Sequence, residues 1–120
     1  MSHDIPYLKP PDQAVFRDHM ETKVAQWIRQ WDGQEQLLAG IIGIPLSKPS
    51  ISLSGASTTP AAVRAAFKSF TTYSMEYGVD LQDRAVRDLG DIQMHVTDIA
   101  ECHRRIEESL RALYAALPNL

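Results

Sequence analysis

Apolar residues recur at helical spacing in the first third of the chain, after an extended arm. Residues 1–11 hold several prolines, which prevent a helix from starting before the last of them. From Asp12 onward, apolar residues fall three or four positions apart, and charged residues occupy the other positions. Gly33 suits the left-handed conformation that closes a helix. We therefore predict a helix with one buried apolar face: Phe16, Met20, Val24, Trp27, Ile28 and Trp31.

Two later apolar segments are interpreted as strands. Residues 37–45 form a continuous apolar run without alternation, as expected of a strand that is covered on both faces in a parallel sheet. Pro45 ends this run, and the Ser-, Thr-, Pro- and Gly-rich residues 46–59 are predicted to form a long loop. Residues 85–92 are predicted to form the second strand, which ends around a Gly-Asp pair.

Each predicted strand is followed by a predicted helix. Thr59 is expected to cap the first helix, with Pro60 at its first position, where a missing N–H costs nothing. The predicted buried stripe of this helix comprises Val63, Ala66, Phe67 and Phe70. Asp98 is expected to cap the last helix, with Glu101 as its capping-box partner, and Pro118 to end it. The apolar stripe of the last helix comprises Ile99, Cys102, Ile106, Leu110, Leu113 and Leu117.

The order of these elements predicts the class of fold. A strand, a helix and a second strand in sequence are typical of a parallel β-α-β unit with a right-handed crossover, and a polar turn near Gly78 precedes the second strand. We predict an α/β protein with residues 1–36 as an N-terminal arm and helix and residues 37–120 as the start of an α/β domain. Because a parallel sheet normally has several strands and only two are predicted, we expect the fold to be incomplete in this chain.

Composition narrows the classes of function. Hydrophobic residues make up 44% of the chain and charged residues 22%, which is typical of a globular protein. The formal net charge of −3 argues against a nucleic-acid binder that depends on a basic face. The single cysteine, Cys102, fits a reducing compartment, and the sequence shows neither a signal-peptide pattern nor a membrane span. We expect a cytoplasmic protein whose partners include neither nucleic acid nor a membrane.

The densest group of possible metal ligands lies near the last helix. His95, Asp98, Cys102 and His103 are close in sequence, but Cys102 is needed in the apolar stripe and Asp98 as the cap. The spacings typical of zinc sites are missing from this group, so we interpret it as cap, core and solvent-exposed residues. The serine-rich loop likewise lacks the motif of a nucleophile elbow or of a phosphate-binding loop.

The predicted positions of two segments at the ends of the strands indicate where a ligand site would lie. The carboxyl ends of parallel strands are where α/β sheets bind ligands, and residues 46–59 and the turn at 88–91 are both predicted to lie there. Two interpretations remain open. In the first, these segments form the rim of a site. In the second they are structural: Asp91 bonds neighbouring backbone N–H groups, and Arg64 holds its helix against the loop.

Four short motifs, taken in order, resemble the beginning of the ureohydrolases, the family of arginase, agmatinase and formimidoylglutamase. They are a Gly-x-Pro strand end, a Gly-Ala loop, a Pro-x-x-Val-Arg helix start and an Asp-x-Gly-Asp strand end, at 41–45, 54–57, 60–64 and 88–91. The similarity runs from about Leu37 to Leu117. Within the family, residues 46–52 and 94–98 are most similar to the formimidoylglutamase-type branch.

The resemblance implies a three-layer α/β/α fold around a parallel sheet and a two-manganese centre. In such enzymes the metal pair supplies a hydroxide that attacks the carbon of an amidine or guanidine. For the formimidoyl branch, the reaction is hydrolysis of N-formimidoyl-L-glutamate to L-glutamate and formamide, within histidine degradation. The family's metal ligands come from Gly-Gly-x-His, Asp-x-His-x-Asp and Ser-x-Asp-x-Asp motifs, none of which this sequence contains. We therefore assign no catalytic, cofactor-binding or metal-binding residue to this chain.

Two hypotheses about function remain. In the first, the chain is the N-terminal portion of a manganese-dependent ureohydrolase. The complete enzyme would use manganese and a small amidine or guanidine substrate, while the 120 residues alone would bind no manganese pair and hydrolyse nothing. In the second, the chain is a truncated, non-catalytic relative that acts as a binding or oligomerisation module. Because strand edges and uncovered apolar faces favour association, we expect a homo-oligomer or self-association.

Overall fold

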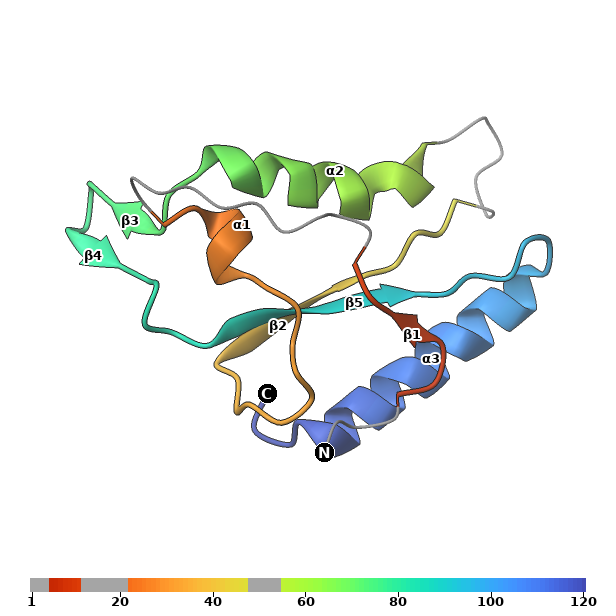
Figure 1. The fold of residues 1–120 in the computed structure, drawn as a ribbon. Helices are drawn as coiled ribbons and strands as arrows, with labels where there is room; N and C mark the ends of the chain where they lie inside the picture. The colour runs from red at the N-terminus through yellow and green to blue at the C-terminus, as the bar shows by residue number, and fades with distance from the viewer. Residues whose placement is uncertain (1–4, 12–21, 48–54) are drawn as a thin grey trace.

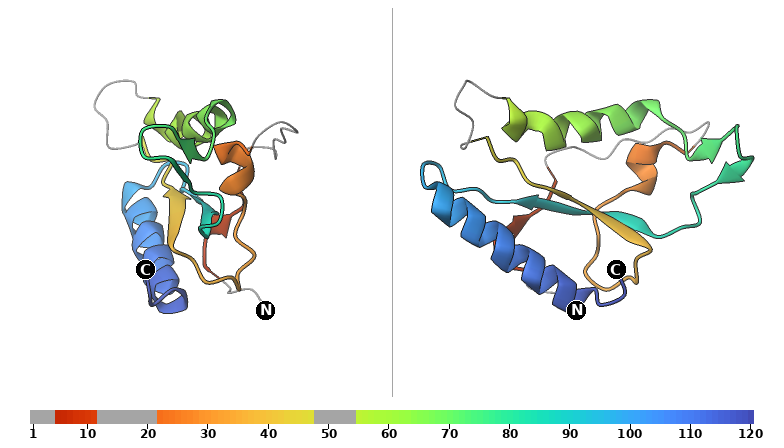
Figure 2. Two further views of the ribbon diagram at one scale, coloured as in Figure 1. Left: turned by 90° about the vertical axis from the view of Figure 1, so that its left-hand side faces the viewer. Right: turned by 180° about the vertical axis from the view of Figure 1, so that it is seen from behind.

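A computed structural model of the chain describes residues 5–11, 22–47 and 55–120. These residues form a three-stranded sheet with α2 (Thr59–Ala66) on one face and α3 (Ile99–Ala116) on the other, as Figure 1 shows. A short hairpin lies beyond one end of the sheet, and the view from behind in Figure 2 shows the same separation of the two helices. This layered arrangement is the predicted α/β fold.

The sheet is built around β5 (Val86–Ile92), which lies between the other two strands. β2 (Ala39–Gly43) pairs with β5 in parallel, which confirms the predicted pairing. β1 (Leu8–Lys9) pairs with β5 in the antiparallel direction, with Leu8 opposite Ile92. The sheet as a whole is mixed, and the expected number of two strands is wrong. The extended arm adds an edge strand because Leu8 and Lys9, which lie between its prolines, have backbone groups free to pair.

The predicted helix through Trp31 is shorter in the part of the chain that the structure describes. Its first part, 12–21, lies outside the described residues, and α1 covers only Val24–Trp27. Beyond α1, the Asp88 amide donates to the Arg29 carbonyl at 2.8 Å, and the Trp31 amide donates to the Asp88 carbonyl at 2.9 Å. The prediction of a helix up to Trp31 is therefore wrong, because these backbone groups pair with β5 instead of with one another.

The segment after β2 turns helical earlier than predicted. A 3₁₀ turn, η1 (Ala56–Thr58), runs directly into α2, and Thr58 is the N-cap of that helix. The hydroxyl of Thr58 donates to the Gly55 carbonyl at 2.7 Å, which stabilises the turn. The predicted cap at Thr59 is therefore one residue late, and the end of the predicted loop is helical. Residues 48–54, the middle of that loop, lie outside the described residues.

The predicted apolar stripe of α2 is not buried. Val63 and Phe70 are 47% and 60% exposed, Ala66 is exposed and Phe67 is half-buried. The side chain that α2 does bury is Arg64, which is 5% exposed. The prediction is wrong because two carboxylates of β5 pair with this helix, so that ion pairing rather than apolar packing decides which side of α2 faces inward.

A hairpin and a second 3₁₀ turn separate α2 from β5. The turn is η2 (Phe67–Ser69), and the hairpin joins β3 (Tyr73–Ser74) to β4 (Val79–Asp80). Strands of two residues are too short to show an alternating pattern, so the sequence indicated only the turn between them. Gly78 occupies that turn with φ +61°. Gly33 also has the predicted positive φ, +85°, but it lies in a turn several residues beyond α1 rather than at the end of a helix.

The start of α3 agrees with its prediction in part. The Asp98 carboxylate accepts a hydrogen bond from the Glu101 amide at 3.1 Å, which confirms the predicted cap. The Glu101 carboxylate does not complete a capping box, because it pairs with Arg104 and Arg105. The helix ends at Ala116, just before Pro118, as expected.

The small apolar core of the described residues involves β5 and α3. Ile92 of β5 and Cys102 and Leu113 of α3 are the buried apolar residues there, and Ser109 is fully buried as well. Ile99, at the start of the predicted stripe, is 39% exposed. Among the described helices, none combines the length and the apolar character needed to cross a membrane.

Candidate functional site

The carboxyl ends of the two parallel strands and one side of α2 meet at the same edge of the sheet. Gly43, the last residue of β2, lies opposite Asp91 near the end of β5. Arg64 of α2 reaches both Asp88 and Asp91. We call Arg64, Asp88 and Asp91 the strand-end cluster. It lies at the carboxyl ends of the strands, where parallel α/β sheets generally bind ligands, so it is the candidate site.

Arg64 is the centre of this cluster. Its Nε donates to Asp88 Oδ2 at 2.6 Å and its Nη2 donates to Asp88 Oδ1 at 3.0 Å, so the contact is bidentate. Nη2 also lies 3.3 Å from the Gly90 carbonyl, to which it donates. Nη1 lies 2.8 Å from Asp91 Oδ1 at an angle unsuited to a hydrogen bond, so this contact is an ion pair. All three charged side chains are no more than 5% exposed.

The electrostatics of the cluster favour a structural role for it. Burial alone would lower the pKa of Arg64, but its hydrogen bonds with Asp88 and its ion pair with Asp91 outweigh this effect and raise the pKa above the ordinary value. Asp88 also accepts a hydrogen bond from the Gly90 amide at 2.9 Å. The backbone contact expected of Asp91 is therefore made by Asp88, and Arg64 holds α2 against β5 rather than against the loop. Both carboxylates are engaged by the arginine.

Two glycines make room for this arrangement. A Cβ atom on Gly43 would lie 1.8 Å from Asp91 Oδ1 and 2.9 Å from the Pro60 Cβ, so a larger residue would displace the carboxylate. Gly90 has φ +98°, and a Cβ on it would lie 2.0 Å from the carbonyl oxygen of Lys9. Two of the glycines in the sequence motifs, Gly43 and Gly90, are thus explained by close approach and by backbone conformation.

An apolar hollow of about 310 Å³ lies beside the strand-end cluster. Arg64 is the charged residue that borders it. The other main lining side chains come from β2 and the residue after it, from α2 and from the first residue of η2: Ile41, Ile42, Ile44, Pro60, Val63 and Phe67. Because the guanidinium is already paired with Asp88 and Asp91, this hollow presents mostly hydrocarbon and suits an apolar occupant.

The residues considered as metal ligands hold one another instead. His95 Nδ1 accepts from the amides of Thr97 and Asp98 at 3.2 and 2.9 Å, and Asp98 caps α3. The Cys102 thiol donates to the His95 carbonyl at 3.4 Å, and His103 is exposed. Across the described ranges, no group of three or more His, Cys, Asp or Glu side chains is placed to hold a metal ion. These residues do not fit a manganese site, and no chemical step is assigned to such a metal here.

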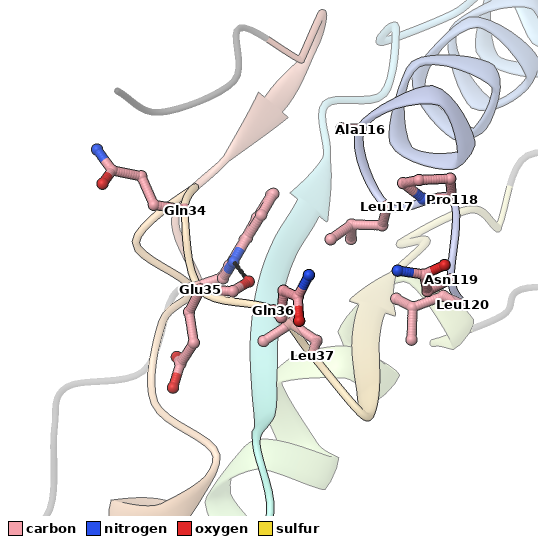
Figure 3. A pocket seen from close by; sticks show the side chains of 10 residues that line it. Gln34, Glu35, Gln36, Leu37, Ala116, Leu117, Pro118, Asn119 and Leu120 are labelled. Atoms are coloured by element: carbon pink, nitrogen blue, oxygen red, sulfur yellow. Dashed lines mark hydrogen bonds between the residues drawn. The ribbon is translucent and has the colours of Figure 1, made fainter.

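A second hollow, of about 190 Å³, lies between the segment after Trp31 and the end of α3 (Figure 3). The Trp31 indole N–H donates to the Glu35 carbonyl at 3.0 Å, which holds this segment in a turn. The Glu35 carboxylate accepts two hydrogen bonds from Arg87, at 2.9 and 3.0 Å. Nothing in the sequence pattern indicated this pair, because the partners are 52 residues apart. Like the strand-end cluster, it ties an outer segment to β5.

The fold and the strand-end cluster define an α/β protein in which a buried arginine holds the crossover helix α2 against the sheet. The model of the arginase family matches residues 38–118, and the chain belongs to the arginase family. This result confirms the resemblance to the ureohydrolases that the four sequence motifs indicated.

Individual relatives and a solved structure agree with this assignment. A formimidoylglutamase of Bacillus subtilis (strain 168) is 41% identical to 95% of the chain, and one of Halalkalibacterium halodurans is 47% identical to 83% of it. An N(1)-aminopropylagmatine ureohydrolase of Thermococcus kodakarensis is 27% identical over 79 residues. The crystal structure of the B. subtilis formimidoylglutamase covers 95% of the chain with a TM-score of 0.77.

The chain matches only part of the length of each relative. The chain covers 35% and 31% of the two formimidoylglutamase sequences and 36% of the solved chain, so it spans about a third of the length of the relatives it matches. The arginase family in general consists of manganese-dependent enzymes that act on small substrates. In the part of the chain that the structure describes, no group of three or more His, Cys, Asp or Glu side chains could hold such a metal pair.

Proposed function

We propose that this chain forms the N-terminal part of an arginase-family hydrolase similar to formimidoylglutamase. The reaction would be cleavage of the amidine C–N bond of N-formimidoyl-L-glutamate by water, giving L-glutamate and formamide. The observation that carries the proposal is the 41% identity to a formimidoylglutamase over 95% of the chain, together with the fold shared at a TM-score of 0.77. In this proposal, residues 1–36 are an arm and helix, and residues 37–120 begin the catalytic domain.

Within such an enzyme, we assign the described residues a scaffolding role. Arg64 engages both carboxylates at the end of β5, so these carboxylates do not offer the free oxygen ligands that manganese prefers. Metal ligands and catalytic groups would therefore come from residues outside those described. The strand-end cluster would hold the edge of the sheet on which they assemble. A cytoplasmic location belongs to the same proposal, and the free, buried thiol of Cys102 supports it.

The experiment compares the longer enzyme that this proposal requires, which we call the intact protein, with the 120-residue chain expressed alone. Formamide release from N-formimidoyl-L-glutamate is measured with added Mn²⁺, and agmatine and arginine serve as comparison substrates. We expect the intact protein to release formamide, and the shorter chain to release none and to bind no manganese pair. Hydrolysis of agmatine or arginine in preference to the formimidoyl compound would contradict the proposed substrate. Turnover by the 120 residues alone, abolished by a chelator, would contradict the scaffolding role.

Apolar side chains exposed on the hairpin favour a second candidate function, a non-catalytic binding or oligomerisation module. Met75 and Tyr77 are 89% and 76% exposed, and Tyr73 and Val79 are about half exposed. An isolated two-stranded hairpin is only marginally stable in water, so contact with another surface would stabilise it. Sedimentation together with the formamide assay separates the candidates. A catalytically inactive dimer would favour the module, whereas an active enzyme would favour the hydrolase.

A further inference from the structure

The N-terminal arm crosses the end of β5 and contacts α3, as Figure 1 shows for β1. The Gln93 amide donates to the Tyr7 carbonyl at 2.8 Å, directly after the end of β5. The Ser109 hydroxyl, in a fully buried residue of α3, donates to the Pro6 carbonyl at 2.7 Å. The arm therefore supplies the hydrogen-bond acceptor for a buried group of the helix, and it joins β5 to α3.

Tyr7 is the main anchor of this arm. The guanidinium carbons of Arg105 and Arg104 lie 4.8 and 5.5 Å from the centre of its ring, within the range of cation–π attraction. Arg104 Nη2 also donates to the Tyr7 hydroxyl at 2.8 Å. Tyr7 has φ +63°, which is uncommon for a residue with a side chain. Such a conformation persists where surrounding contacts impose it, so the strain is maintained by these side-chain contacts.

Gly90 connects the arm to the strand-end cluster. On one side, the position of its missing Cβ is taken by the Lys9 carbonyl, 2.0 Å away. Its amide donates to Asp88 Oδ1 at 2.9 Å, and its carbonyl accepts from Arg64 Nη2 at 3.3 Å. A single residue thus contacts the arm and, through both of its backbone groups, two members of the cluster. Any movement of the Gly90 backbone would therefore change its contacts both with the arm and with the strand-end cluster.

We propose that residues 6–9 are a detachable strap that holds the carboxyl end of β5 in place. Tyr7 is its anchor, and Gly90 transmits its position to the strand-end cluster. β1 has only two residues. Pro10 directly after it and Pro6 two residues before it lack an N–H with which to extend the pairing. A segment held by so few backbone bonds opens locally at low cost, well before the protein unfolds. The docked strap favours one cluster geometry, and the released strap loosens it.

The test is amide hydrogen exchange of the intact protein with a variant of the anchor. In Tyr7→Ala, which removes both the ring contacts and the hydroxyl, we expect exchange at Gln93 and at Gly90 to rise about tenfold or more. Tyr7→Phe keeps the ring and should show a smaller rise at the same two amides. Tyr114→Ala is the matched control, because Tyr114 is a 68% exposed tyrosine of α3, and it should leave both amides unchanged.

Two outcomes would overturn the proposal. Faster exchange at Gln93 with unchanged exchange at Gly90 would show an arm that detaches without affecting the cluster. Unchanged exchange at both amides would show that Tyr7 does not hold the arm. The exchange readout does not depend on catalysis, so it stands or falls separately from the proposed hydrolase.

A second variant acts from the opposite side of the contact. In Gly90→Ala, the added methyl group should push away the Lys9 carbonyl, while Tyr7 is retained. We expect faster exchange at Gln93 and faster cleavage by chymotrypsin after Tyr7, with exchange in the middle of α3 unchanged. A protected arm in this variant would contradict the coupling through Gly90. If α3 also exchanges faster, the protein has lost its fold, and the Tyr7 variants decide.

Discussion

The two faces of the sheet are covered by helices that are held in different ways. On the α3 face, the buried side chains of the helix are Cys102, Ser109 and Leu113, so apolar packing predominates. On the α2 face, the buried side chain is Arg64, while Val63 is 47% exposed. Apolar burial is non-directional and tolerates small shifts, whereas a bidentate arginine contact has a definite geometry. The position of α2 therefore depends on charged hydrogen bonds, and its apolar side is left for another surface to cover.

Replacement of Arg64 should lower the stability of the protein more than any other change that tests this difference between the two faces. Arg64→Ala leaves the carboxylates of Asp88 and Asp91 buried without their cation, so we expect the free energy of unfolding to fall by about 3–5 kcal/mol. Urea denaturation of the intact protein measures it. Arg111→Ala is the control, because its ion pair with Glu107 is exposed and should contribute less than about 1 kcal/mol. Equal losses in the two variants would contradict the role given to the strand-end cluster.

Truncation of one apolar side chain on each face sharpens the comparison. In the 120-residue chain, Leu113→Ala should lower the free energy of unfolding by about 2–4 kcal/mol, because Leu113 is 6% exposed. Val63→Ala should lower it by less than about 1 kcal/mol, since this side chain is half in solvent. Urea denaturation of both variants provides the measurement. In the intact protein, a larger cost of Val63→Ala would show that another segment covers α2. A large cost already in the short chain would contradict the difference between the faces.

The smallest expected effect concerns charges at the start of α3. Hydrogen bonds from Arg104 and then Arg105 lower the pKa of Glu101 from 4.5 to about 2. Because the folded state prefers the ionised carboxylate, the stabilisation is fully present above pH 4.5 and is lost as the pH falls through about 2. An NMR titration of the Glu101 carboxyl carbon in the intact protein measures the shift. Arg104→Gln should move the midpoint back toward 4.5, and an unshifted wild-type midpoint would contradict the ion pairs.

Short sequence patterns predicted those elements whose structure depends on residues nearby in the sequence. The continuous apolar run at 37–45 and the cap at Asp98 are both read from a few consecutive positions. The cap and the strand were confirmed, but β2 is shorter than the run and Gly43 is its one buried residue, so the expected cover on both faces is not seen. The helix through Trp31 was wrong because its backbone pairs with Asp88, a residue far along the chain. β1 was missed for the same reason, since a short arm with prolines at positions 6, 10 and 11 shows no strand pattern until its partner is known.

The candidate site was predictable in position but not in its contacts. Strand ends and the family motifs indicated Arg64 and residues 88–91, and the structure brings these together. The expectation of a turn at 88–91 is wrong, because these residues pair with β2 and β1 as part of β5. The apolar spacing in α2 wrongly predicted that Val63 and Phe70 are buried. Such spacing depends only on which residues are hydrophobic, and it contains no information about the distant carboxylates that pair with Arg64. The anchor at Tyr7 had no local signal either, since its partners on α3 lie 97 residues away.

The pairing of β5 has a consequence for how this sheet can grow. One edge of β5 is bonded to β2, and β1 pairs along the opposite edge, with the backbone of residues 29–31 bonded to Asp88. Within the described ranges, the outer edge of β2 has no strand beside it. A further strand would therefore add next to β2, because the N-terminal segments already occupy the other flank of β5.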